Sequence, residues 1–222
     1  MFKTIILSII IPLLELLTFN YTYHINLLDK VFNTKIFHLP NKTPYLIGIT
    51  IALILYTIKN TKLTKKTFKH TYKYLFLIPT ILLPIINIKL SIILIPIILF
   101  LINKNNHTKE TLSIKNIISI NIINLLTLIN IPIFISTLLA CKINKISKKE
   151  SLKISIFLMI LNNLKYIVNL TIDNYTIISI ILSTIVSTYF INKLINIYNQ
   201  NKLHKISIIL ILIILFKLYW FR

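Results

Sequence analysis

Residues 74–103 read YLFLIPTILLPIINIKLSIILIPIILFLIN, and Lys89 is the one charged residue among them. A helix needs about 20 apolar residues to cross the hydrocarbon layer of a membrane. The stretch is therefore long enough for one long tilted helix or, if Lys89 lies at a turn, for a hairpin of two short helices. A continuous apolar run favours helices, because the strands of a membrane barrel alternate apolar and polar side chains.

Apolar runs of this kind recur along the whole chain, which is 56% hydrophobic and has a mean hydropathy of +0.82. Lipid offers the backbone no hydrogen bonds, and helices satisfy their backbone groups internally. The expected fold is all-α: a polytopic transmembrane bundle of about seven or eight helices, several of them kinked by proline. No linker is evident, so residues 1–222 are expected to form a single transmembrane domain. The runs lie at 4–23, 44–58, 74–88, 89–103, 116–141, 152–171, 175–197 and 206–221.

The charge balance is strongly basic, with 25 lysines and arginines against 5 acidic residues. Such a charge can neutralise the phosphates of RNA, but no RNA-binding motif accompanies it and no nucleic-acid partner is expected. Basic loops of membrane proteins instead act as signals that keep a loop on one side of the membrane. The most basic loops are 59–73, 142–153 and 192–205. Seven helices would allow all three to share one side and eight would not, and both topologies stay open.

Amino acids whose codons begin with G are scarce: the chain has three valines, two alanines, one glycine and five acidic residues. This indicates an A/T-rich gene, as organellar genes often are. The scarcity of small residues predicts that hydrogen bonds from Asn, Ser and Thr, including Asn121, Asn124 and Asn130, hold the helices together in place of close glycine packing. The single cysteine excludes a disulfide framework, and the spacing of the five histidines predicts no metal site and no cofactor.

The stretch GITIALILYTIKNTKLTKKTFKHTYKYLFLI, residues 48–78, resembles the antiporter-like membrane subunits of respiratory complex I, and NADH dehydrogenase subunit 2 in particular. In that family a helix is followed by a pair of basic residues, here Lys65 and Lys66, and then by the entry into the next helix. The segment NLLTLINIPIFISTLLACKI is similar to the family's signature of a proline-broken helix that ends at a lysine of the proton path. Pro132, Phe134 and Lys142 are the counterparts in this chain.

The resemblance implies a shortened membrane-arm subunit of a proton-translocating NADH:ubiquinone oxidoreductase in the mitochondrial inner membrane. Such a subunit is not catalytic alone, holds no cofactor, and has the other membrane subunits of a large respiratory complex as partners. Two alternatives stay open: a non-catalytic structural or assembly subunit of another respiratory or ATP synthase complex, and a component of a membrane translocase. Anionic lipid such as cardiolipin is a further expected partner, bound by Lys65, Lys66, Lys69 and Lys73.

Charged residues inside expected spans are the candidates for a proton path, since a charge at membrane depth is costly and is by default a functional hypothesis. Glu15 is the only acid in such a run, and it is either a proton-path carboxylate or the ion-pair partner of a lysine from a neighbouring helix. Lys89 is either a second proton site or the hairpin turn. Lys165 follows two asparagines well inside its run, and Lys142 completes the set.

Overall fold

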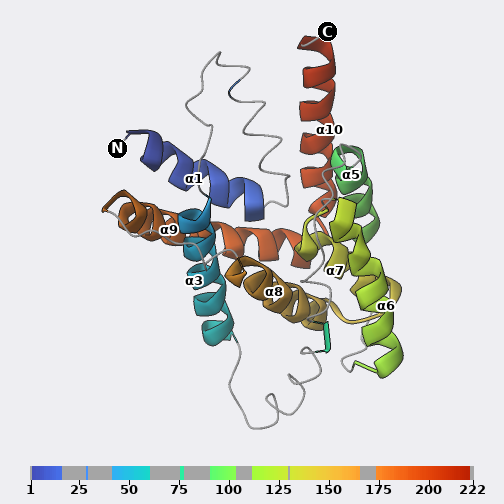
Figure 1. Ribbon diagram of the computed structural model, residues 1–222. Helices are drawn as coiled ribbons and strands as arrows, with labels where there is room; N and C mark the ends of the chain where they lie inside the picture. The colour runs from blue at the N-terminus through green and yellow to red at the C-terminus, as the bar shows by residue number, and fades with distance from the viewer. Residues whose placement is uncertain are drawn as a thin grey trace. The chain divides into compact units, whose positions relative to one another are not determined.

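The computed structural model describes residues 2–16, 29, 42–60, 76–77, 91–103, 112–129, 131–165 and 174–220. Over these residues the chain is helical and contains no strand, which confirms the all-α prediction (Figure 1). The helices are α1 (Phe2–Leu16), α3 (Thr43–Asn60), α5 (Ser91–Ile102), α6 (Ile114–Asn124), the 3₁₀ turn η2 (Leu125–Ile129), α7 (Ile133–Ile143), α8 (Lys148–Leu164), α9 (Asn174–Asn199) and α10 (Leu203–Trp220).

Within the described residues, α3 and α9 are long and apolar enough to cross a membrane, judged by length and composition. Shorter apolar helical segments lie at Ile114–Leu128, Ile133–Ile143 and Leu203–Ile213. An 11-residue helix such as α6 or α7 extends over only about 16 Å, roughly half of the hydrocarbon layer.

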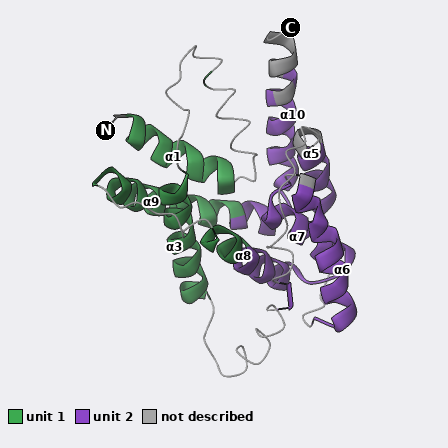
Figure 2. Ribbon diagram, viewed as in Figure 1, with its two compact units in different colours: residues 1–68, 159–194 green, residues 69–158, 195–222 purple. Residues whose placement is uncertain are grey.

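The chain divides into two compact units, neither of which is continuous in sequence (Figure 2). Unit 1 comprises residues 1–68 and 159–194, and unit 2 comprises residues 69–158 and 195–222. Two of the three boundaries fall inside α8 and α9, so each of these helices contributes one end to each unit. The division therefore does not coincide with a linker in the sequence.

In unit 1, α1 lies beside α3, and α3 meets α9 at Gly48. A side chain at position 48 would overlap the Ser183 hydroxyl and lie 2.8 Å from the carbonyl oxygen of Ile180. Gly48 and the fully buried Ala52 one turn later form a small-residue stripe on α3, the pattern that lets membrane helices approach closely. The expectation that this chain lacks close glycine packing is therefore wrong at this crossing, because one glycine is enough where a serine faces it.

Between residues 176 and 189, helix α9 is polar on its buried face and apolar on its exposed face. The last third of the helix is the reverse, since apolar residues such as Ile191 and Leu194 are buried there and Lys193 is exposed. Thr176, Ser179, Ser183 and Ser187 are buried, at intervals of three or four residues. Large side chains that are also spaced four residues apart are exposed on the other face: Ile177, Ile181, Ile185 and Tyr189. Ser179 and Ser183 donate their hydroxyl protons to backbone carbonyls within the helix, at 2.8 and 3.1 Å, which is why they can be buried without a large penalty.

In unit 2, α5 and α10 pack as an antiparallel pair. The Ser207 hydroxyl donates to the carbonyl oxygen of Pro96 at 2.8 Å, and near the start of α10 the His204 amide donates to Asn103 Oδ1 at 3.3 Å. Helix α7 packs against α5 as well as against α6.

The apolar run 116–141, expected as one helix, is divided in the structure into α6, η2 and α7. The two helices form an antiparallel hairpin: Asn124 contacts Ser136 near its tip, and Ser119 contacts Asn144 nearer its open end. Pro132, at the N-cap of α7, has no backbone N–H to continue a helix and disfavours a helical conformation at Ile131. A second difference concerns Glu150, expected in a loop, which lies in the first turn of α8.

Candidate functional site

The tip of the α6–α7 hairpin holds a buried polar cluster. Asn124 Oδ1 accepts hydrogen bonds from Ser136 Oγ at 2.9 Å and from Thr137 Oγ1 at 3.2 Å, and all three residues are fully buried. Thr127 in η2 donates its hydroxyl proton to the Asn124 carbonyl at 2.8 Å. Because Pro132 fixes where α7 begins, the two hydroxyls lie one turn into the helix and face the last residue of α6. The broken helix thus brings the cluster together.

One polar group of this cluster has no partner among the described residues. Asn124 Nδ2 is buried and makes no hydrogen bond to the residues that the structure describes. An unsatisfied buried donor costs about 1–3 kcal/mol, and such groups in native proteins often bond a water or a ligand. The two N–H donors of Asn124 Nδ2 are therefore open to a small polar species at the hairpin tip.

The open end of the hairpin, away from its tip, belongs to a region that we call the basic polar end of unit 2. This region is formed by the ends of α5, α7 and α9 and the starts of α8 and α10. Lys142, in the last turn of α7, donates from Nζ to the carbonyl oxygen of Leu101 in α5. Lys148 Nζ, at the start of α8, donates to the carbonyl oxygen of Asn199 at 3.2 Å and lies 6.0 Å from the centre of the Tyr198 ring. Partial burial lowers the pKa of Lys148. These contacts bring the basic segments 142–153 and 192–205 together. Both were expected as loops, but most of each is helical: the links are short, between Ile143 and Lys148 and between Asn199 and Leu203.

Glu15 lies in the last turn of α1, where it is half-buried. The positive charge of Lys42, which immediately precedes α3, acts on its carboxylate. The sequence analysis allowed a lysine partner for Glu15 but did not identify Lys42. No sequence signal distinguishes Lys42 from the other loop lysines, because the pairing depends on α1 and α3 lying side by side.

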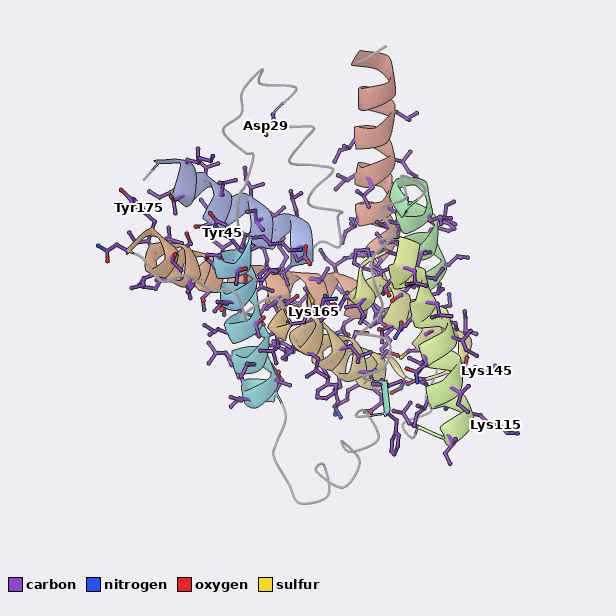
Figure 3. The ribbon with its side chains drawn as sticks, viewed as in Figure 1. Asp29, Tyr45, Lys115, Lys145, Lys165 and Tyr175 are labelled. Carbon is purple, nitrogen blue, oxygen red and sulfur yellow. The ribbon has the colours of Figure 1, made fainter. Side chains whose placement is uncertain are left out.

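The other predicted site residues are placed as follows. Lys165 is exposed in the turn that closes α8, one residue past the end of the helix (Figure 3). Pro132 and Lys142 lie at the two ends of α7. Glu15 and Lys165 belong to unit 1, and Lys142 belongs to unit 2. Lys89 and the four lysines expected to bind lipid, Lys65, Lys66, Lys69 and Lys73, lie outside the described residues.

Across the part of the chain that the structure describes, no group of three His, Cys, Asp or Glu residues is placed to hold a metal ion. Comparison with known proteins finds no matching family model, no similar curated protein and no similar solved structure.

Proposed function

We propose that this chain is a multi-pass membrane protein whose helices form a polytopic bundle. The polarity of α9 carries the proposal: its serines are buried while Ile177, Ile181 and Ile185 are exposed. In water each isoleucine would gain about 1.5–3 kcal/mol by burial, so a soluble helix would turn the opposite way. In lipid the isoleucines need no protein cover, and the polar side chains belong inside the bundle.

Helix α6 repeats this arrangement. Ile114, Ile118 and Ile122 are exposed along one stripe, while Asn116 and Asn124 are buried on the other face. The buried face of α6 also holds Ile117 and Ile120, so it is mixed rather than polar. Burial of asparagine opposite a stripe of exposed isoleucine still favours a hydrocarbon layer around the bundle. The close Gly48–Ser183 crossing also supports it, since small residues at helix crossings are typical of membrane bundles.

Within the membrane we propose that the chain is an antiporter-like subunit of the membrane arm of a proton-translocating NADH:ubiquinone oxidoreductase, in the mitochondrial inner membrane. The support is the resemblance of residues 48–78 and 124–143, together with the broken segment at Pro132 followed by a helix that ends near Lys142. The subunit carries no electron-transfer chemistry itself. Glu15, with the Lys42 charge beside it, is the candidate for a titrating group.

A second candidate, a non-catalytic structural subunit of a respiratory or ATP synthase complex, is favoured by one observation. The Lys42 charge acts on the Glu15 carboxylate, and an attraction of this kind between two helices serves packing as well as it serves proton transfer. The exposed isoleucine faces fit partner helices as readily as they fit lipid under either candidate.

The test is made on native membranes in two steps. Alkaline extraction should leave the chain in the membrane fraction; its release into the supernatant would contradict the membrane proposal. On native gels of solubilised membranes, the chain should migrate with NADH dehydrogenase activity and be identified in that band by mass spectrometry. Migration with another respiratory complex would instead identify the structural role.

A further inference from the structure

Two features of α6 and α7 together constrain how residues 113–144 can lie in a membrane. The first arm, the apolar helical segment Ile114–Leu128 made of α6 and most of η2, has 15 residues, and α7 has 11. Both are shorter than the about 20 residues that a helix needs to cross the membrane. They are also antiparallel, since Asn144 Nδ2 donates to Ser119 Oγ at 2.9 Å while Asn124 meets Ser136 close to the turn. The segment therefore returns to the end from which it starts.

That end is the basic polar end of unit 2. Lys142 is bonded to the last turn of α5, and Asn103 directly after α5 accepts from the His204 amide near the start of α10. Lys148 joins the start of α8 to the end of α9. Lys115, in the first turn of α6, and Lys145, two residues after α7, are both exposed at the open end of the hairpin (Figure 3). The segment thus has a lysine where it starts and a lysine where it finishes. Lysines are favoured at the surface of a membrane, where the segment would enter and leave.

We infer that residues 113–144 form a re-entrant hairpin, which enters the membrane from the side of the basic loops, turns at η2 near mid-depth and returns to the same side. The inference rests on the proposed membrane location. It explains why the one apolar run is interrupted by Asn124, Thr127 and Pro132 in its middle: a turn inside the membrane needs side chains that satisfy freed backbone groups. Thr127 does this for the Asn124 carbonyl.

The hairpin places the Asn124 cluster near the middle of the hydrocarbon layer. Non-helical backbone at that depth is tolerated only where protein covers it or where it lines a water-filled space. Asn124, Ser136 and Thr137 then form a buried polar site at mid-depth.

Single cysteines labelled with a membrane-impermeant maleimide in sealed vesicles test the inference. The background is the full-length Cys141→Ala chain, because Cys141 is the single cysteine of the sequence and each introduced cysteine is then the one thiol present. Lys115→Cys and Lys145→Cys report the two ends of the hairpin. Lys202→Cys reports the basic loop after α9, and Tyr175→Cys the other end of that 26-residue helix. All four positions are exposed, so the substitutions leave the packing unchanged.

The re-entrant hairpin predicts that positions 115, 145 and 202 are labelled from one side and position 175 only from the other. Labelling of 115 and 145 from opposite sides would show a crossing segment and overturn the inference while leaving the membrane proposal intact. Labelling of 115 and 145 together but opposite to 202 would also overturn it. If 175 and 202 are labelled from the same side without permeabilisation, α9 does not cross a membrane and the proposed function itself fails.

Discussion

Gly48 of α3 lies directly against Ser183 of α9, with no room for a side chain between the two helices. A methyl group at position 48 would overlap the Ser183 hydroxyl and approach the Ile180 carbonyl to 2.8 Å. Since the Ile180 carbonyl belongs to the backbone of α9, the clash is relieved only if the two helices separate.

Gly48→Ala is therefore expected to lower the free energy of unfolding by roughly 1–3 kcal/mol, the usual cost of overpacking. The double variant Gly48→Ala with Ser183→Gly should recover part of that loss but not all of it, because the Ile180 carbonyl remains. Thermal denaturation in lipid nanodiscs measures both. Ile54→Ala, at an exposed position of the same helix, is the matched control. A neutral Gly48→Ala would mean that α3 and α9 do not cross here.

The exposed face of α9 allows a test of whether lipid or water surrounds it. The test is Ile185→Lys, because Ile185 is 62% exposed and lies near the middle of the helix. In lipid a central lysine costs about 2.5–3.5 kcal/mol of insertion free energy, so less protein should appear in the membrane fraction. In water the same surface change would be nearly neutral. Asn196→Lys, exposed near the end of α9, is the control and should insert normally. Equal insertion of both variants would contradict a membrane-facing surface at Ile185.

The buried cluster at the hairpin tip predicts a coupling between two residues. Asn124→Leu removes the acceptor of the Thr137 hydroxyl, which is buried, and should cost about 1–3 kcal/mol of unfolding free energy. Thr137→Val on the Asn124→Leu chain removes the orphaned hydroxyl and should restore part of the stability. A double-mutant cycle with additive effects would show that the two side chains do not interact. Asn196→Ala, exposed on α9, controls for the loss of an amide.

Two helices end in Schellman motifs at residues other than glycine. Lys145 and Asn201 both have φ of 57°, and Ile146 N–H bonds back to the Cys141 carbonyl at 2.9 Å. The left-handed conformation costs a side-chain residue about 1–2 kcal/mol and costs asparagine less. Lys145→Gly should therefore raise the thermal stability more than Asn201→Gly. Lys149→Gly, at an exposed helical position, should lower it. The reverse order of the first two would mean that residue 145 is not left-handed.

Glu15 separates the two proposed functions. If it carries protons, Glu15→Gln should leave the amount of assembled complex unchanged and lower the number of protons moved per NADH oxidised. If it is a structural partner of Lys42, Glu15→Gln and Lys42→Met should each reduce assembly, and the double variant should recover it. Glu150→Gln is the control, because the Glu150 carboxylate lies 3.3 Å from Lys153 Nζ within α8 and has no part in the Lys42 contact. Normal pumping and normal assembly of Glu15→Gln would contradict both roles.

The all-α class and most helix positions follow from the sequence. The runs 44–58, 175–197 and 206–221 correspond to α3, α9 and α10 with ends that differ by a few residues. They are predictable because an apolar run needs only local information: its backbone bonds are made within the helix. The division of 116–141 was not predicted as a hairpin, although its proline break was noticed, because a proline interrupts a helix without determining how far the chain turns.

The polar contacts needed the tertiary structure. Asn124 was recognised as a polar residue in an apolar run, but Ser136 and Thr137 become its partners only when α7 folds back on α6. Lys42 reaches Glu15 only because α1 packs on α3. Composition determined that this chain is helical, apolar and basic, since those properties are sums over residues. Which serine faces Gly48, and which lysine faces Glu15, depends on contacts between segments far apart in the chain, and packing alone decides those.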